Sequence, residues 1–225
     1  AIGESASYNG AFSSNPAGYV AKLDTSGNGT GKSFTNTGNK SYAIGISSDG
    51  VNPYILGKDF NQRLHISKLD HNLSSVTWSY EFGATNANEN YGDIDTDSNG
   101  VTAIVINNQT NSIHTALFAN NGHLTWKKDW SKANTDMSSN GVMPFSIKML
   151  ANGGVAVLCM APGYTTATDR KSFYILVYSS TGTLELQREF RLGSNMAYLE
   201  VNKSLDQTSD GALIVATTWY DPAGS

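Results

Sequence analysis

The stretch 91–130 decides the fold of this chain. It reads Tyr91-Gly-Asp-Ile-Asp-Thr-Asp-Ser-Asn-Gly100, then Val101-Thr-Ala-Ile-Val-Ile106, Ile113-His-Thr-Ala-Leu-Phe118 and His123-Leu-Thr-Trp126 up to Trp130. Four short runs of β-forming residues are separated by turn residues, which indicates an antiparallel meander of four strands. A meander of this length is typical of one blade of a β-propeller.

The turn between the first two runs recurs along the chain. It is written Ser48-Asp-Gly50, Ser98-Asn-Gly100, Asn152-Gly-Gly154 and Ser209-Asp-Gly211. The glycines lie about 50–57 residues apart, a period that indicates a propeller or another repeat array. Asp-Gly and Asn-Gly tolerate positive φ, so we expect two-residue hairpin loops with positive φ at both central positions.

The last run of each unit carries large apolar residues. Val76-Thr-Trp-Ser-Tyr-Glu-Phe82 corresponds to Leu124-Thr-Trp-Lys-Lys-Asp-Trp130 and to Leu184-Glu-Leu-Gln-Arg-Glu-Phe190. Strand alternation places Trp78 and Phe82 on one face, with Trp126 and Trp130 equivalent to them. Because blades pack face to face, we expect these rings to lie in the core.

We therefore expect an all-β chain, a single β-propeller domain over 1–225 with about four blades of four antiparallel strands. Whole blades are expected near 42–84, 90–130 and 143–192, with a partial or composite blade built from 1–35 and 198–225. Both ends supply a second strand, at 1–4 and 212–216, so one of them is redundant. Either the chain is a piece of a longer repeat array, or the spare strand pairs with a neighbouring molecule.

The segment Tyr19-Val-Ala-Lys-Leu-Asp-Thr-Ser-Gly-Asn28, together with Tyr42-Ala-Ile-Gly-Ile-Ser-Ser-Asp-Gly50, resembles the SBBP-type β-propeller repeats of bacterial secreted and surface proteins. The sharp motif covers 19–60, and a diluted form extends over most of the chain. The resemblance implies a propeller exported to the cell exterior, and it carries no catalytic residues with it.

Composition narrows the class of partner. Charged residues make up 15% of the chain and the net charge is −4, without the basic stripe that a nucleic-acid partner would require. No apolar run approaches 18 residues, so we expect no membrane span. Cys159 stands alone in an apolar run, which predicts a buried small hydrophobe rather than a nucleophile.

One acidic segment resembles half of a calcium loop. Asp93, Asp95, Asp97 and Asn99 alternate before Gly100, as the oxygen ligands of such a loop do. The acidic residue that should follow is missing, and a polar strand end with an Asn-Gly turn explains the same residues. Calcium is the only cofactor that the sequence suggests, and both interpretations stay open.

Two long loops are candidates for binding. The loop 5–18 contains Tyr8 and Phe12, and the loop 162–172 contains Tyr164 and Arg170. Exposed rings on a rigid scaffold are common contacts for a sugar or a protein, although the same rings also serve to anchor their own loops.

Asparagine sequons are frequent in the chain. Those in expected loops or turns are predicted glycosylation sites, at Asn28, Asn39, Asn72 and Asn108. Asn202 lies near an expected first strand and is a weaker candidate. An Asn- and Ser-rich chain also produces sequons by chance.

The sequence contains no Gly-x-Ser-x-Gly, no His-Glu-x-x-His and no repeated sialidase-type aspartate box, so we expect no enzyme. The leading hypothesis is an extracellular, non-enzymatic recognition or adhesion module for a protein or a glycan. One alternative is the structural subunit of an extracellular filament or surface array, a homopolymer assembled by strand exchange. The second alternative is a propeller enzyme with an axial site, which loops from several blades would have to assemble.

Overall fold

The chain is all β. A computed structural model describes residues 2–5, 17–34, 41–59, 64–82, 92–108, 112–132, 142–161, 172–191, 197–198, 204–216 and 218–219. These residues form strands and turns, without a helix, and every strand pair among them is antiparallel. Accordingly, the part of the chain that the structure describes holds no helix that could cross a membrane.

Three sheets have four strands each, in meander order. The second sheet consists of β4 (Ser41–Ser48), β5 (Pro53–Asp59), β6 (Leu64–Leu69) and β7 (Val76–Phe82). The third consists of β8 (Gly92–Thr96), β9 (Thr102–Asn108), β10 (Ser112–Phe118) and β11 (Leu124–Ser131). The fourth consists of β12 (Met143–Met149), β13 (Val155–Ala161), β14 (Ser172–Tyr178) and β15 (Leu184–Arg191). The predicted antiparallel four-strand unit is thus confirmed.

The two ends of the chain form smaller sheets. The first sheet contains β1 (Ile2–Ser5), β2 (Ala17–Leu23) and β3 (Gly29–Phe34). The C-terminal pair contains β17 (Leu205–Gln207) and β18 (Leu213–Val215), and a further short pair joins β16 (Ala197–Tyr198) to β19 (Thr218–Trp219). Among the described strands those of the two ends belong to separate sheets, so a composite blade stays a prediction.

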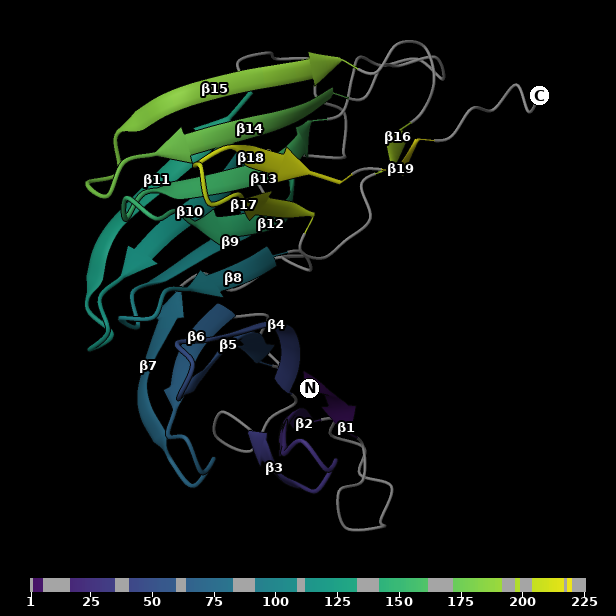
Figure 1. Cartoon of the computed structure of the whole chain (residues 1–225), viewed down its shortest axis with the longest axis vertical. Coiled ribbons are helices and arrows are strands. Elements are labelled where there is room, and N and C mark those ends of the chain that lie inside the picture. Colours follow the sequence, from purple (N-terminus) through teal and green to yellow (C-terminus); the bar gives the residue numbers. More distant parts are fainter. Residues whose placement is uncertain are drawn as a thin grey trace, which may run out of the picture.

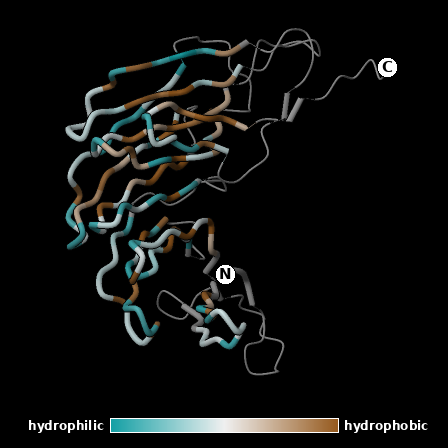
Figure 2. The backbone as a smooth tube through the Cα atoms, in the orientation of Figure 1, coloured by the Kyte–Doolittle hydropathy of each residue, from teal (hydrophilic) through white to brown (hydrophobic). Residues whose placement is uncertain are grey.

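The sheets follow one another around an open arc, with the first sheet at one end and the fourth sheet and C-terminal pair at the other (Figure 1). The first strands of successive sheets contact one another, β4 with β8, β8 with β12 and β12 with β17. Hydrophobic segments concentrate along the strands of the third and fourth sheets (Figure 2).

The core consists of apolar layers between neighbouring sheets. Tyr54 and Ile66 of the second sheet pack with Ile104 and Phe118 of the third. A larger layer joins the third and fourth sheets and includes Cys159, which is fully buried as predicted. Among the residues whose burial the structure describes, the layer between the first and second sheets has Val20, Ile55, Leu69 and Leu73 as its buried members.

The hairpin turns differ from the predicted two-residue type. In the turn after β8, the Asp97 amide donates to the Val101 carbonyl, and the Gly100 amide donates to the Asp97 carbonyl. Gly100 has φ +78°, whereas Asn99 does not have positive φ, since Leu73 is the only described non-glycine residue that does. The expectation of two central residues with positive φ is therefore wrong. The loop is a turn closed by one left-handed residue, and glycine meets that single requirement.

Tryptophan side chains join successive sheets. Trp78 of β7 donates from Nε1 to the Asn120 carbonyl at 2.8 Å, in the turn between β10 and β11. Trp126 of β11 donates in the same way to the Ser180 carbonyl at 3.0 Å, in the turn between β14 and β15. Trp126 and Trp130 are both buried, which confirms the expected core role of these two rings.

Candidate functional site

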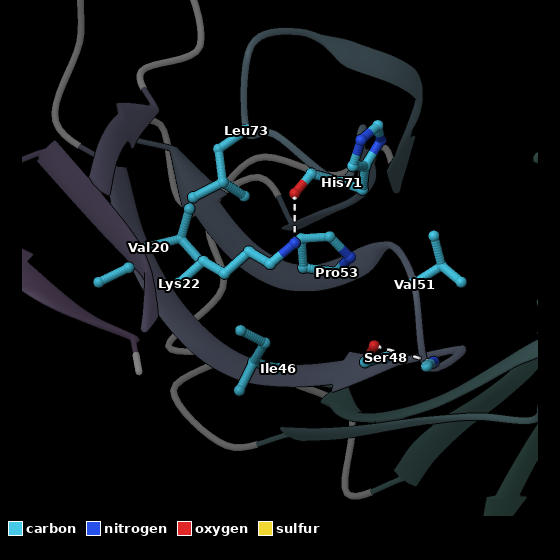
Figure 3. A pocket seen from close by; sticks show the side chains of 10 residues that line it. Val20, Lys22, Ile46, Ser48, Val51, Pro53, His71 and Leu73 are labelled. Atoms are coloured by element: carbon cyan, nitrogen blue, oxygen red, sulfur yellow. Dashed lines mark hydrogen bonds between the residues drawn. The ribbon is translucent and has the colours of Figure 1, made fainter. Parts of the chain in front are cut away.

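A hollow of about 340 Å³ opens between the first and second sheets (Figure 3). Its apolar lining comes from β2, β4, the turn that leads into β5 and the turn that follows β6, with Val20, Ile46, Val51, Pro53 and Leu73 as its main members. Val51 is 61% exposed, whereas Leu73 is 3% exposed, so the hollow runs from an open rim to a closed floor.

Two polar groups lie on the rim of this hollow. The Lys22 side chain extends from β2 and donates from Nζ to the His71 carbonyl at 2.9 Å (Figure 3). This bond ties the first sheet to the turn between β6 and β7. A mostly apolar concavity with a few placed polar groups is the usual form of a binding pocket.

Leu73 forms the floor because the turn adopts an unusual backbone. Its φ is +60°, in the left-handed region that glycine occupies in the corresponding turns, as at Gly122 and Gly182. For a residue with a Cβ this conformation costs about 1–2 kcal/mol. The side chain is directed into the cluster with Val20, Ile55 and Leu69, where burial offsets the cost.

A second, polar groove of about 530 Å³ lies beside β8, β12 and the C-terminal pair. Lys148 of β12 is its central cation, with Nζ 3.0 Å from Asp206 Oδ1 and 3.7 Å from Asp95 Oδ2. Partial burial alone would lower the pKa of Lys148. The hydrogen bond with Asp206 and the charge of Asp95 hold that pKa above its ordinary value. The lysine is therefore charged and already paired at neutral pH.

The acidic residues of the calcium hypothesis bind protein groups in this region. Asp93 Oδ2 accepts from the Ile147 amide at 3.1 Å, and Asp95 Oδ2 accepts from the Met149 amide at 2.8 Å. Both aspartates lie on one face of β8, two residues apart, and both carboxylates bond to β12 of the next sheet. They join the third and fourth sheets.

Asp97 and Asn99 lie in the turn that follows. Asp97 Oδ1 accepts from the amides of Asn99 and Val101, at 2.9 and 2.8 Å. The described residues hold no group of three His, Cys, Asp or Glu side chains arranged to bind a metal. These contacts account for the polar residues as turn and junction residues, and calcium stays a prediction.

The remaining predicted residues divide into two sets. Asn28 and Asn72 lie exposed in turns, and Asn108 ends β9, so these three sequons stay predicted glycosylation sites. The other predicted residues lie outside the described residues and stay predictions: Tyr8, Phe12, Asn39, Tyr164 and Arg170.

Sequence reasoning missed the hollow. Its signal was the turn Asp70-His-Asn-Leu-Ser-Ser75, which has leucine where the corresponding turns have glycine. Such a replacement is informative, because a leucine in the left-handed region needs a buried contact to compensate for its strain. Lys148 gave no comparable signal, since its acidic partners come from two other sheets.

No known family model matches the chain, and no curated protein matches it. Among solved structures, the chain is similar to a protein of unknown function from Bacteroides caccae, with a TM-score of 0.47 and 9% identity, over 88% of this chain and 59% of that one. It is also similar to BBS1N from a complex with ARL6DN, with a TM-score of 0.34 and 13% identity, over 82% of this chain and 67% of that one. The chain spans 59% of the length of the Bacteroides caccae protein.

Proposed function

We propose that this chain is a non-enzymatic, extracellular recognition module of the β-propeller type, with about four blades, and that the hollow between its first and second sheets binds a protein partner. The observation that carries the proposal is the apolar hollow itself, which is open at Val51 and closed by Leu73. A volume of about 340 Å³ suits one or two apolar side chains of a partner.

The lining favours a protein over a glycan. Sugars are commonly held against aromatic rings, and the described lining contains no Tyr, Trp or Phe. Aliphatic walls with Lys22 and His71 at the rim suit an apolar side chain flanked by polar backbone. A glycan contact through Tyr8 or Tyr164 is a separate prediction.

The propeller proposal is supported by the face-to-face packing of four-stranded meanders and by the contacts between their first strands. The extracellular location is supported by the likeness to exported SBBP-type repeats and by exposed sequons at Asn28 and Asn72. These features suit adhesion or recognition at a cell surface.

A selection from a random peptide library on the immobilised chain tests the binding hollow. We expect peptides with an apolar anchor that bind the wild-type chain and lose at least tenfold in affinity on Val51→Asp, because burying one apolar side chain contributes about that much. Ile214→Asp is the matched control, since Ile214 is also exposed but lies on β18 in the C-terminal pair and is not part of the lining of the hollow. Selected peptides that bind Val51→Asp as well as wild type would refute the assignment.

A further inference from the structure

The fourth strands of the sheets share one register position that carries a large apolar side chain. Trp78 pairs with Lys68, Trp126 pairs with Leu117, and Leu186 pairs with Val177. In each case the partner is the second-to-last residue of the third strand. Trp126 is 8% exposed beneath the next sheet, whereas Leu186 is 40% exposed.

The next sheet supplies a matching pair of residues. Trp78 stacks on Phe118, with ring centroids 6.3 Å apart, and a Cβ on Gly122 would lie 2.6 Å from its indole. Trp126 packs on Tyr178, at 5.7 Å between ring centroids, and a Cβ on Gly182 would lie 2.9 Å from it. Each junction thus combines a ring at the end of the third strand with a close-approach glycine in the following turn.

The first sheet has an aliphatic residue and a glycine at these two positions, Leu23 and Gly27, and no described tryptophan packs on them. Leu23 is the last residue of β2 and pairs with Gly29, as Phe118 pairs with Leu124 and Tyr178 with Leu184. Leu23 is 58% exposed. The turn that follows contains Gly27 with φ +82°, and a Cβ placed there would meet no atom within 4 Å.

The fourth sheet has an uncovered outer half. The C-terminal pair packs through Leu205, Leu213 and Val215 on the apolar face of this sheet. Phe190 on β15 stacks on Phe173 at 4.7 Å between ring centroids but is 42% exposed, although Trp130 at the same register position of β11 is 7% exposed. The described strands therefore leave Leu186 and Phe190 exposed, on the side of β15 that in β11 faces the next sheet.

We infer that the fourth sheet of one copy of this chain docks onto the first sheet of a second copy, with Leu186 packing against Leu23 and the Gly27 turn. The contact repeats the Trp78 and Trp126 junctions between molecules. Its two halves lie at opposite ends of the arc (Figure 1), so the interface is head-to-tail rather than two-fold symmetric. After two copies dock, one of them still has a free first sheet and the other a free fourth sheet. Further copies can therefore add at both ends.

Strand order sets a condition on this docking. By their position before and after the corresponding turns, β2 and β3 match third and fourth strands, and β1 matches a second strand. The C-terminal pair already supplies a first and a second strand. One complete four-stranded sheet needs a single second strand, so β1 or β18 is released when the copies meet.

Sedimentation of the wild-type chain over a range of concentrations tests the docking. We expect reversible association that Leu186→Asp weakens by roughly tenfold or more, through loss of a buried leucine. Leu186→Trp should strengthen it, because tryptophan occupies the two equivalent places. Leu184→Asp is the matched control. Leu184 is equally exposed, but it pairs with Tyr178 and therefore lies on the opposite face of β15.

Cysteine cross-linking identifies the occupant of the site. Leu186→Cys in one preparation and Ser26→Cys in another should give a mixed disulfide on oxidation, while Asn121→Cys, at the same place in a turn already covered by Trp78, should not. Cys159 is buried and does not interfere. A chain carrying both Leu186→Cys and Ser26→Cys that yields only internally bridged monomers would overturn the proposal in favour of ring closure within one chain. Monomers at every concentration, with no cross-link, would also overturn it. Neither result bears on the hollow at Val51.

Discussion

At the junction between the second and third sheets a strand supplies the large side chain and a turn supplies the small one, whereas at the junction between the first and second sheets these roles are exchanged. Trp78 on β7 packs against Gly122 in the next turn. In the first sheet Thr30 occupies the register position of Trp78, opposite Lys22, and the next turn carries Leu73 in place of glycine.

The exchange shows which property of the repeat is fixed. Each junction buries one large side chain between its two sheets, and either side of the junction can supply it. Leucine in the left-handed region costs about 1–2 kcal/mol, and full burial of its side chain contributes about 1.5–3 kcal/mol. Burial in the cluster with Val20, Ile55 and Leu69 therefore offsets the unusual backbone at Leu73.

Placing a large residue on both sides of one junction should have the largest effect. Gly122→Leu adds left-handed strain to a direct clash with Trp78, and we expect it to reduce the free energy of unfolding by about 3–5 kcal/mol in urea denaturation. Gly27→Leu is the control, because it adopts a similar φ with open space above it and should cost only about 1–2 kcal/mol.

The double variant Gly122→Leu with Trp78→Thr recreates the first junction at the second. We expect the double variant to lose less unfolding free energy than the two single variants lose together, by about 1 kcal/mol or more. If the two losses simply add, a leucine in the turn cannot replace the tryptophan on the strand at this junction.

The next effect in size concerns Leu73 itself. Leu73→Ala removes the buried side chain but keeps the left-handed strain, and it should cost about 2–3 kcal/mol of unfolding free energy. Leu73→Gly removes the same side chain and also the strain, so it should be less destabilising than alanine by about 1 kcal/mol. This is the reverse of the usual order. Alanine proving the better substitute in thermal and urea unfolding would show that Leu73 is not strained.

The meander was predictable from sequence, because turn glycines and apolar runs alternate locally in a way that only successive antiparallel strands satisfy. The type of turn was not, since Asn-Gly and Asp-Gly fit both a two-residue loop and the longer loop seen at Gly100. The hollow was also hidden. It depends on a contact between Leu73 and Val20, which belong to different sheets, and no local sequence pattern predicts a contact between residues so far apart in the chain. Likewise, Asp93 and Asp95 have the spacing of ligands, but their partners come from β12.

The junction between the second and third sheets also contains a network of polar side chains, whereas the bond described above at the first junction joins the Lys22 side chain to the His71 carbonyl. Tyr54 Oη lies 3.0 Å from Asp49 Oδ2 and 3.3 Å from Asn120 Oδ1, so one hydroxyl bridges the two sheets. Lys68 Nζ bonds to Asn120 and lies 3.7 Å from Asp49. Burial, together with the hydrogen bond and charge of Asp49, raises the pKa of Tyr54, so the phenol stays protonated.

The smallest expected effect is the pH dependence that Asp49 gives to this junction. Partial burial would raise the pKa of its carboxyl, but the amides of Asn52 and Val51, with the side chains of Asn52 and Tyr54, lower it to about 2. The folded-state pKa lies below the ordinary value, so this stabilisation is complete above about pH 4 and is lost as the pH falls towards 2.

Asp49→Asn should therefore reduce the free energy of unfolding by about 1–2 kcal/mol at pH 7. In urea titrations from pH 7 down to pH 3, the gap between variant and wild type should begin to narrow only below about pH 4. Asp24→Asn is the control, because it removes a carboxylate from an exposed turn of the first sheet that does not take part in this network. A gap that stays constant across that range would show that the charge of Asp49 does not stabilise the junction.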